Sequence, residues 1–192
     1  MLERRDAVAT ILRERGDALV VTGLGSPTWD AAAAGDSRLN FYLWGAMGGA
    51  AMVGLGLAVS QPRRRVVVIT GDGELLMGLG SLATIGVDGT PNLSIVVLDN
   101  ERYGETGMQT SHTARGVDLA AIAAAARFRS TTTIHTREEL EAWIPTVYVG
   151  PGPVLGVVKV VADQPPVQVP VRDGAYLKAR FREALLGAKA FE

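Results

Sequence analysis

The sequence predicts a doubly wound α/β fold, in which helices cover both faces of a mostly parallel β-sheet. Residues 66–70 and 93–99 are continuous apolar runs of strand length, which is typical of parallel strands buried on both faces. Segments with helical spacing separate the candidate strands, as in other α/β folds. Glycine accounts for 23 of 192 residues, more than the usual share of about 7%, which favours tight turns and close backbone approach to a ligand. We therefore expect a ligand at the carboxyl ends of the strands.

The remaining elements follow from apolar spacing and composition. The predicted helices have helical spacing of apolar residues or are rich in alanine; they are residues 4–15, 28–34, 48–60, 75–87, 118–127, 138–144 and 176–186. The predicted strands continue the alternation; they are residues 18–22, 41–43, 66–70, 93–99, 130–134 and 154–161. Asp118 is expected to cap the N-terminus of its helix. Residues 48–60 carry no charge, so we expect this helix to be buried on all sides. We also expect the uncharged residues 45–58 to form an interface between subunits.

Composition narrows the organisation and the function. We expect a single domain over residues 1–192, with a proline-rich connector and a terminal helix from about residue 163. The net charge of −1 argues against nucleic acid or an anionic membrane as a partner. Zero cysteines exclude disulfides and thiolate metal sites, and two histidines exclude a three-histidine zinc site. With no apolar leader and no convincing span, a cytoplasmic location is expected.

Glycines and polar residues follow three of the predicted strands. Gly71-Asp72-Gly73-Glu74 follows residues 66–70, Asn100 follows residues 93–99, and Gly25-Ser26 lies just beyond the first strand. A carboxylate and an amide oxygen on neighbouring strand ends suit Mg²⁺, which also takes phosphate oxygens as ligands. The glycines let backbone N–H groups approach a phosphate. No complete dinucleotide-binding or P-loop motif occurs, so the pattern favours another diphosphate-bearing cofactor.

Gly71-Asp72-Gly73 followed by 26 residues and Asn100 resembles the signature of thiamine diphosphate enzymes, specifically of their diphosphate-binding domain. The segments GDGELLMGLGSLAT and LDNERYGETGMQ are particularly similar to sulfopyruvate decarboxylase beta subunits and phosphonopyruvate decarboxylases. The resemblance covers roughly residues 18 to 160. It implies thiamine diphosphate and Mg²⁺ as cofactors.

The resemblance also implies roles for single residues. Asp72 and Asn100 would bind Mg²⁺ through their side chains and Arg102 through its carbonyl oxygen. Other positions would contact thiamine diphosphate: the carbonyl of Gly45 at the aminopyrimidine, Met47 as an apolar wedge, Tyr103 beside the cofactor, and Gly25, Ser26, Gly71, Gly73 and Glu74 around the diphosphate. Glu74 replaces a smaller residue, so its backbone N–H is the expected contact. Asp99 stands where many relatives have asparagine and is a candidate cap for the following turn.

The implied activity is that of a carboxy-lyase acting on a 2-oxo acid. The activating glutamate of the family lies on a pyrimidine-binding domain, which we expect on a separate subunit, in a heterotetramer. Gln109 and His112 lie in a polar loop and are candidates for a catalytic role or for contact with substrate. Four arginines are expected to have no role in the core: Arg4, Arg5, Arg13 and Arg15. A carboligase or acyl-transfer subunit, and a non-catalytic nucleotide-sensing module, remain open as alternatives.

Overall fold

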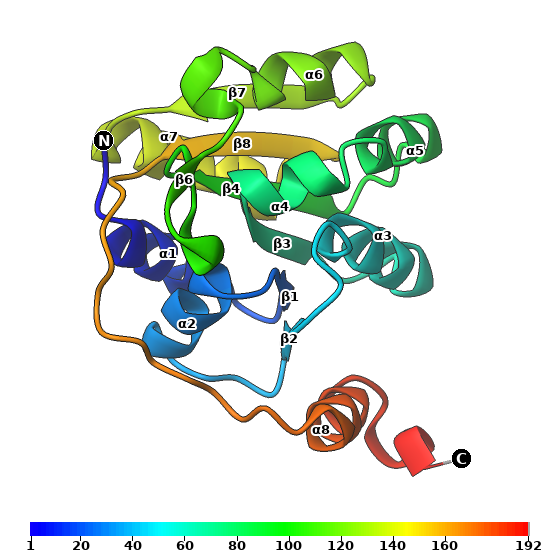
Figure 1. Cartoon of the computed structure of the whole chain (residues 1–192). Coiled ribbons are helices and arrows are strands. Elements are labelled where there is room, and N and C mark those ends of the chain that lie inside the picture. Colours follow the sequence, from blue (N-terminus) through cyan, green and yellow to red (C-terminus); the bar gives the residue numbers. More distant parts are fainter. Residues whose placement is uncertain (192) are drawn as a thin grey trace.

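The structure is a computed structural model that describes residues 1–191. Its centre is a six-stranded sheet in the order β2-β1-β3-β4-β8-β7, and all its strand pairs are parallel (Figure 1). The strands are β1 (Leu19–Thr22), β2 (Asn40–Tyr42), β3 (Val66–Gly71), β4 (Leu93–Asp99), β7 (Ser130–Ile134) and β8 (Val154–Lys159). A small antiparallel hairpin outside this sheet pairs β5 (Arg102–Tyr103) with β6 (Gln109–Thr110).

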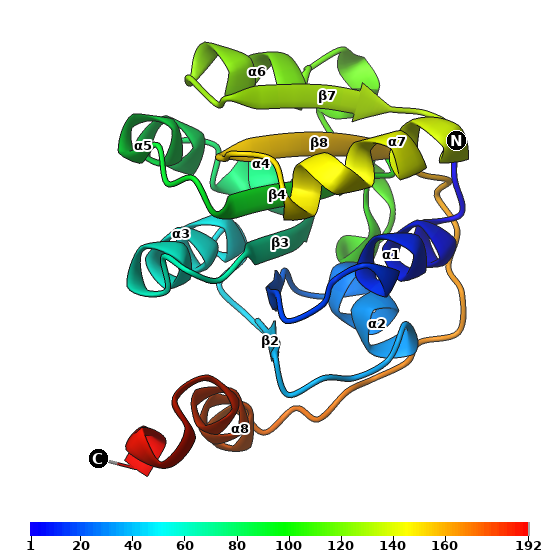
Figure 2. The ribbon, with the colours of Figure 1, turned by 180° about the vertical axis from the view of Figure 1, so that it is seen from behind.

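Helices cover both faces of the sheet, which confirms the predicted fold class (Figures 1 and 2). One face carries α1 (Arg4–Arg13), α2 (Ser26–Ala33) and α7 (Arg137–Tyr148). The other face carries α3 (Ala50–Ser60), α4 (Asp72–Met77), α5 (Ser81–Asp88) and α6 (Leu119–Ala125). The last helix, α8 (Gly174–Leu186), lies near the β2 edge, and three short 3₁₀ segments complete the chain: η1 (Gly104–Thr106), η2 (Thr113–Arg115) and η3 (Gly187–Phe191).

Side chains of the central strands point alternately to the two faces of the sheet, and because both faces are covered by helices, the strands are apolar throughout. In β3, Val67 and Ile69 pack into the core under α1, α2 and α7, whereas Val66 and Val68 pack into the core under α3 to α6. These four side chains are fully buried. Burying an aliphatic side chain of this size contributes about 1.5–3 kcal/mol, so both faces of each central strand must be apolar. This arrangement brings the carboxyl ends of β1, β3 and β4 together on one side of the sheet.

The C-terminal segment packs against the edge strand β2. Phe181 of α8 meets Phe41 edge to face, with ring centroids 5.6 Å apart. Arg180 pairs with Asp36 at 2.6 Å, next to the same strand. The segment before α8 runs along the outside of α1 and α2 (Figure 2), and the carbonyl of Val171 accepts a hydrogen bond from the Trp44 indole at 3.3 Å.

The expectation that Arg4 and Arg5 have no core role is wrong. Arg4 is buried, and its Nε lies 2.5 Å from the fully buried carboxylate of Asp30 on α2. Arg5 donates to the other oxygen of Asp30 at 3.2 Å and to the carbonyl of Pro166 at 2.8 Å. A buried carboxylate needs such partners because its desolvation is costly. These arginines therefore fasten α1 to α2 and to the C-terminal segment.

Two predicted helices differ from the structure. The α3 helix is not buried on all sides, since Met52, Val53 and Val59 are 40%, 37% and 56% exposed. The helix predicted over residues 75–87 is divided into α4 and α5. A Cβ on Gly78, between them, would lie 2.1 Å from the carbonyl oxygen of Gly48, so the chain bends where two backbones touch. No helix among residues 1–191 has the length and apolar character needed to cross a membrane.

Candidate functional site

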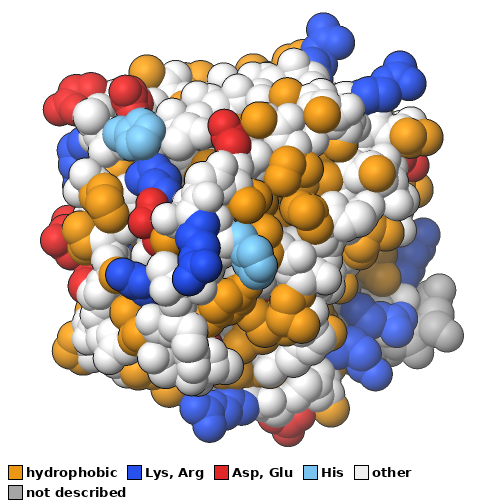
Figure 3. Space-filling model, turned by 45° about the horizontal axis from the view of Figure 1, so that its top comes forward, with side chains coloured by type: hydrophobic (Ala, Val, Ile, Leu, Met, Phe, Trp, Pro, Cys, Tyr) orange, Lys and Arg blue, Asp and Glu red, His pale blue; other side chains and the backbone are white. Residues whose placement is uncertain are grey.

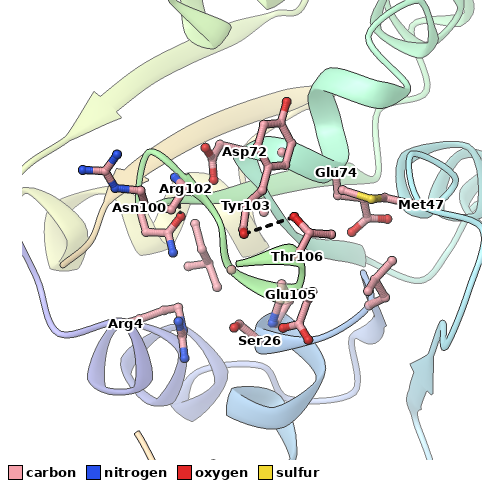
Figure 4. Close-up of a pocket in the computed structure, with 16 residues that line it drawn as sticks. Arg4, Ser26, Met47, Asp72, Glu74, Asn100, Arg102, Tyr103, Glu105 and Thr106 are labelled. Carbon is pink, nitrogen blue, oxygen red and sulfur yellow. Dashed lines mark hydrogen bonds between the residues drawn. The ribbon is translucent and has the colours of Figure 1, made fainter. Parts of the chain in front are cut away.

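A cavity opens at the carboxyl ends of β1, β3 and β4 (Figure 4). Residues after each of these strands line it, together with the hairpin that follows β4. Of the residues predicted for the site, the structure places these on the cavity: Ser26, Met47, Gly71, Asp72, Gly73, Glu74, Asn100, Arg102 and Tyr103. Ser26 and Tyr103, which are 77 positions apart in the chain, thus line the same cavity at the carboxyl ends of the strands.

Asp72 begins α4 directly after β3, and its side chain is almost completely buried. Its Oδ2 accepts hydrogen bonds from the hydroxyls of Ser111 at 2.5 Å and Thr113 at 3.3 Å. Burial raises the pKa of Asp72 to about 6, the Ser111 hydrogen bond opposes that rise, and the charge of Asp99 adds to it. A bound cation would favour the charged form of this carboxylate.

Asn100 lies beside Asp72 because β3 and β4 are in register, with Gly71 opposite Leu98. The Oδ1 atom of Asn100 accepts the backbone N–H of Arg102 at 3.0 Å, which closes a tight turn. Asp99 caps the same turn, as expected, by accepting the N–H of Glu101 at 3.0 Å. Its other oxygen pairs with the Lys159 ammonium at 3.0 Å, so this second buried carboxylate near the cavity has a cationic partner.

Glu74 is buried, and its side chain turns back toward the sheet. Its Oε2 accepts the Thr70 hydroxyl at 2.8 Å, and a Cβ on Gly23 would overlap the carboxylate, so a larger residue at position 23 would displace the Glu74 side chain. Within residues 1–191, Oε1 has no hydrogen-bond partner of normal geometry. Burial raises the pKa of Glu74, and the Thr70 hydroxyl and the N–H groups of Ala50 and Gly48 oppose that rise.

Met47 reaches the cavity from the segment before α3, and its side chain is 36% exposed. Gly45 and Gly25, also predicted for the site, do not line it. Gly48, next to Met47, has a φ of +90° and lies so close to Gly78 that a Cβ would be 2.8 Å from the Gly78 nitrogen. This contact between two backbones fixes where the Met47 side chain enters the cavity.

The comparison with protein families decides the identity of this arrangement. Residues 24–158 match the family described as thiamine pyrophosphate enzyme, C-terminal TPP binding domain. The chain belongs to this family. The match includes the residues after β1, β3 and β4 that line the cavity.

Individual relatives agree with the family. The chain is 46% identical over 123 residues to the sulfopyruvate decarboxylase subunit beta of Methanothermobacter thermautotrophicus, covering 64% of this chain and 65% of that protein. It is 42% identical over 139 residues to the phosphonopyruvate decarboxylase of Streptomyces viridochromogenes, covering 72% of this chain and 34% of that protein. The chain thus spans somewhat less than two thirds of the first relative and about a third of the second.

The fold also matches a solved structure, the thiamine diphosphate-dependent 4-hydroxybenzoylformate decarboxylase of Rhodococcus jostii RHA1. The TM-score is 0.70 at 18% sequence identity, and the match covers 85% of this chain and 33% of that chain. A likeness at this identity concerns the fold. It supports the parallel sheet with helices on both faces as the thiamine diphosphate-binding fold.

The hairpin after β4 contributes both predicted and unforeseen residues to the thiamine pyrophosphate-binding domain. The Tyr103 ring packs on Gly73, where a Cβ would lie 2.6 Å from the ring, and its hydroxyl is 3.2 Å from Nδ1 of His112. His112 and Gln109 are exposed and do not line the cavity. Gln109 instead hydrogen-bonds with Thr106 of its own loop at 2.8 Å.

Glu105, which the sequence did not single out, points toward the start of α2 (Figure 4). A Cβ on Gly25 would lie 2.4 Å from its carboxylate, and Gly25 has a φ of +71°, which favours glycine. Glu105 is an exposed residue, but partial burial of its carboxylate raises its pKa, while the N–H of Ser26 and the charge of Arg4 oppose the rise. A carboxylate of this chain therefore lies where a helix N-terminus attracts anions.

The residues present fit a Mg²⁺–diphosphate group. Asp72 and Asn100 offer the carboxylate and amide oxygens that Mg²⁺ takes together with phosphate oxygens. No cluster of three or more acidic or histidine ligands occurs among residues 1–191, so phosphate oxygens would have to complete the coordination.

Proposed function

We propose that this chain is the diphosphate-binding subunit of a thiamine diphosphate-dependent 2-oxo acid decarboxylase. The observation that carries the proposal is the position of Asp72 and Asn100 on adjacent strand ends, with Met47 reaching the same cavity. The names of the relatives, sulfopyruvate and phosphonopyruvate decarboxylases, support 2-oxo acids with an anionic group as substrates.

In the proposed site, Asp72 and Asn100 bind Mg²⁺ through side-chain oxygens and Arg102 binds it through its carbonyl. The N–H groups of Gly73 and Glu74 donate to the diphosphate at the start of α4. Bound thiamine diphosphate supplies the nucleophilic carbon and the electron sink for loss of carbon dioxide. Met47 packs against the bound cofactor and excludes water from the reacting centre.

Gly71, Gly25, Ser26 and Tyr103 complete the proposed cofactor contacts, and Gly45 offers its carbonyl to the aminopyrimidine. Gly45 and Gly25 do not line the cavity. Their contacts would therefore require the segment before α3 and the turn before α2 to settle onto the cofactor. Gln109 and His112 are proposed to contact substrate once the hairpin closes over the site.

The proposal includes a separate pyrimidine-binding subunit that supplies the activating glutamate. An apolar surface supports this partner: Met52, Val53 and Val59 of α3 and Met77 of α4 are 37–63% exposed. Figure 3 shows hydrophobic side chains over the centre and right of one face, with few charged ones among them. Exposed apolar patches of this kind mark interfaces. A heterotetramer with two copies of each chain is the assembly we propose.

The decisive experiment compares this chain alone with its complex. Carbon dioxide release from sulfopyruvate, phosphonopyruvate and pyruvate is measured with thiamine diphosphate and Mg²⁺, with and without a pyrimidine-binding subunit. We expect activity only in the complex. Full activity of the chain alone would refute the split site, and product that appears only with an acceptor aldehyde would indicate a carboligase instead.

A separate experiment tests whether the apolar surface of α3 and α4 binds the partner subunit. Met52→Asp places a charge in the apolar surface and should weaken the complex by at least tenfold, because the charge must be desolvated on association. Val167→Asp changes a valine that is 52% exposed on the C-terminal segment and serves as the matched control. Equal association of both variants would place the partner elsewhere.

A further inference from the structure

Two buried hydroxyls interrupt an otherwise exposed part of the chain after β6. Ser111 and Thr113 are 1% and 9% exposed, whereas His112 between them is exposed. The backbone N–H of Ser111 is bonded to the carbonyl of Glu101 at 2.9 Å, so the segment is held beside the turn after β4. We call Ser111 and Thr113 the hydroxyl clasp.

The hydroxyl clasp joins the two buried carboxylates at the ends of β3 and β4. Ser111 Oγ lies 2.5 Å from Oδ2 of Asp72, and Thr113 Oγ1 lies 2.8 Å from Oδ1 of Asp99. The two hydroxyls are 2.8 Å apart, and Thr113 is also 3.3 Å from the same Oδ2. Each hydroxyl has one proton to donate. Two protons thus serve two carboxylates. Without Ser111, Asp72 and Asp99 compete for the proton of Thr113, and without Thr113, Ser111 is the one hydroxyl of the clasp left to hold Asp72.

The geometry also distinguishes the two oxygens of Asp72. Both hydroxyls approach Oδ2, and within residues 1–191 no side chain hydrogen-bonds to Oδ1. Lys159 already pairs with Asp99 at 3.0 Å and with Glu101 at 2.5 Å. Asp99 therefore shares one cation with Glu101, whereas Asp72 forms no ion pair within residues 1–191 and is the carboxylate left to meet a cation at the cavity.

We propose that Ser111 and Thr113 are positioning residues for the cation site: they hold the Asp72 carboxylate by Oδ2, so that Oδ1 is presented to Mg²⁺. The inference rests on the proposed function, in which Asp72 is a Mg²⁺ ligand. Mg²⁺ demands near-ideal octahedral geometry, whereas Ca²⁺ accepts irregular geometry. A carboxylate that is fixed in orientation favours Mg²⁺, and one that can rotate loses that preference.

The hydroxyl clasp also fixes the hairpin to the metal carboxylate. The hairpin places Tyr103 on Gly73 and Glu105 at the start of α2, and its C-terminal end is tied to Asp72 through Ser111. The orientation of Asp72 and the position of the hairpin are therefore set by the same hydrogen bonds.

The test uses the full chain in complex with the pyrimidine-binding subunit and measures thiamine diphosphate binding by titration calorimetry at a series of Mg²⁺ or Ca²⁺ concentrations. For Ser111→Ala and Thr113→Val we expect the Mg²⁺ concentration at half-saturation to rise roughly tenfold, as expected for the loss of a hydrogen bond to a charged group. The corresponding Ca²⁺ concentration should change less than threefold, so that the preference for Mg²⁺ falls. Thr113→Ser, which keeps the hydroxyl, should remain within twofold of wild type.

Thr110→Val is the matched control, because Thr110 is exposed on β6 of the same hairpin. Thermal unfolding without metal identifies a purely structural role: a lower midpoint with an unchanged Mg²⁺ requirement would overturn the inference. Should Ser111→Ala not fold, Thr113→Val, which preserves volume, decides the question alone. The wild-type titration tests the proposed function itself. If wild type binds no thiamine diphosphate at any Mg²⁺ concentration, the proposed function is wrong, and the inference about Ser111 and Thr113 is wrong with it.

Discussion

The strand ends that carry Asp72 and Asn100 and the hairpin from Arg102 to Thr110 line the same cavity, but different interactions hold them in place. The strand ends continue from β3 and β4, which pair over six residue positions and are buried almost throughout. The hairpin has two residue pairs of its own, and many of its residues are exposed. Glu101 and Met108 both have a φ of +61°, a conformation that costs energy without glycine.

The two regions therefore differ in what positions their residues. The sheet positions the strand ends, whereas side-chain contacts between distant segments position the hairpin. A residue after a central strand is placed by the strand itself, so its chemistry can be read from its position in the chain. A hairpin residue is placed by the few side chains that hold the hairpin down, chiefly Tyr103, Ser111 and Glu105. Changes at the strand ends should therefore abolish cofactor binding, and changes in the hairpin should adjust it.

Asp72→Ala gives the largest expected effect. The variant removes the carboxylate from the proposed Mg²⁺ site, so Mg²⁺-dependent affinity for thiamine diphosphate should fall by at least a hundredfold. Titration calorimetry on the assembled enzyme measures the loss. Asp6→Ala, an exposed acidic residue on α1, provides the control for a lost surface charge. Unchanged affinity in Asp72→Ala would remove the metal assignment.

Gly73→Ala tests the contact between the two regions. The added Cβ would lie 2.6 Å from the Tyr103 ring, so the ring and the hairpin must shift, at a cost of about 1–3 kcal/mol in the free energy of unfolding. Cofactor affinity should fall roughly tenfold with it. Gly80→Ala is the matched control, since a Cβ there meets no atom within 4 Å. Denaturant unfolding measures the stability of both variants.

The same prediction can be sharpened with Tyr103→Ala. If the ring is the obstacle, Gly73→Ala should cost markedly less stability in the Tyr103→Ala background than in wild type. Equal costs in both backgrounds would show that Gly73 is required for its backbone and not for the hairpin contact.

The contrast between the regions also explains what could be predicted from sequence. The apolar runs of β3 and β4 placed Asp72 and Asn100 at adjacent strand ends, and the structure has them there. Ser111 and Thr113 were missed because a polar loop has no periodicity that marks a buried hydroxyl. The Arg4–Asp30 pair was missed because its members lie 26 positions apart and each resembles an ordinary surface residue.

Helix exposure was harder to predict than helix position. The α3 helix lies close to its predicted range, but its uncharged sequence suggested burial on every side. In the structure Met52, Val53 and Val59 are exposed, because the sheet covers one face of the helix and nothing in residues 1–191 covers the other. The sequence of one chain does not show whether an apolar helix face is buried in the core of that chain or by a partner chain.

Glu105→Gln is expected to act in the opposite direction from the other variants. The Glu105 carboxylate lies at the N-terminus of α2, close to Ser26, and would compete there with the diphosphate. Removing its charge should tighten binding of inorganic diphosphate and of thiamine diphosphate roughly three- to tenfold. Glu3→Gln, an exposed glutamate outside the site, makes the same charge change as a control.

The effect of Glu105 should depend on pH with a defined sign. Burial raises the pKa of Glu105, and protonation removes the competing charge. The difference between wild type and Glu105→Gln should therefore be full above this pKa and shrink as the pH falls through it. A difference that grows on acidification would exclude competition by the carboxylate.

The smallest effect on cofactor binding is expected for His112→Ala and Gln109→Ala. His112 contacts the Tyr103 hydroxyl at 3.2 Å and Gln109 bonds to Thr106 at 2.8 Å, and neither residue lines the cavity. Affinity for thiamine diphosphate should stay within about twofold of wild type, since an exposed hydrogen bond contributes little. Turnover should fall if the hairpin closes over substrate, because both side chains would then meet the reacting acid. His135→Ala, which changes the second histidine, outside the cavity, is the control. Turnover at the wild-type level in both hairpin variants would show that these two side chains only face solvent.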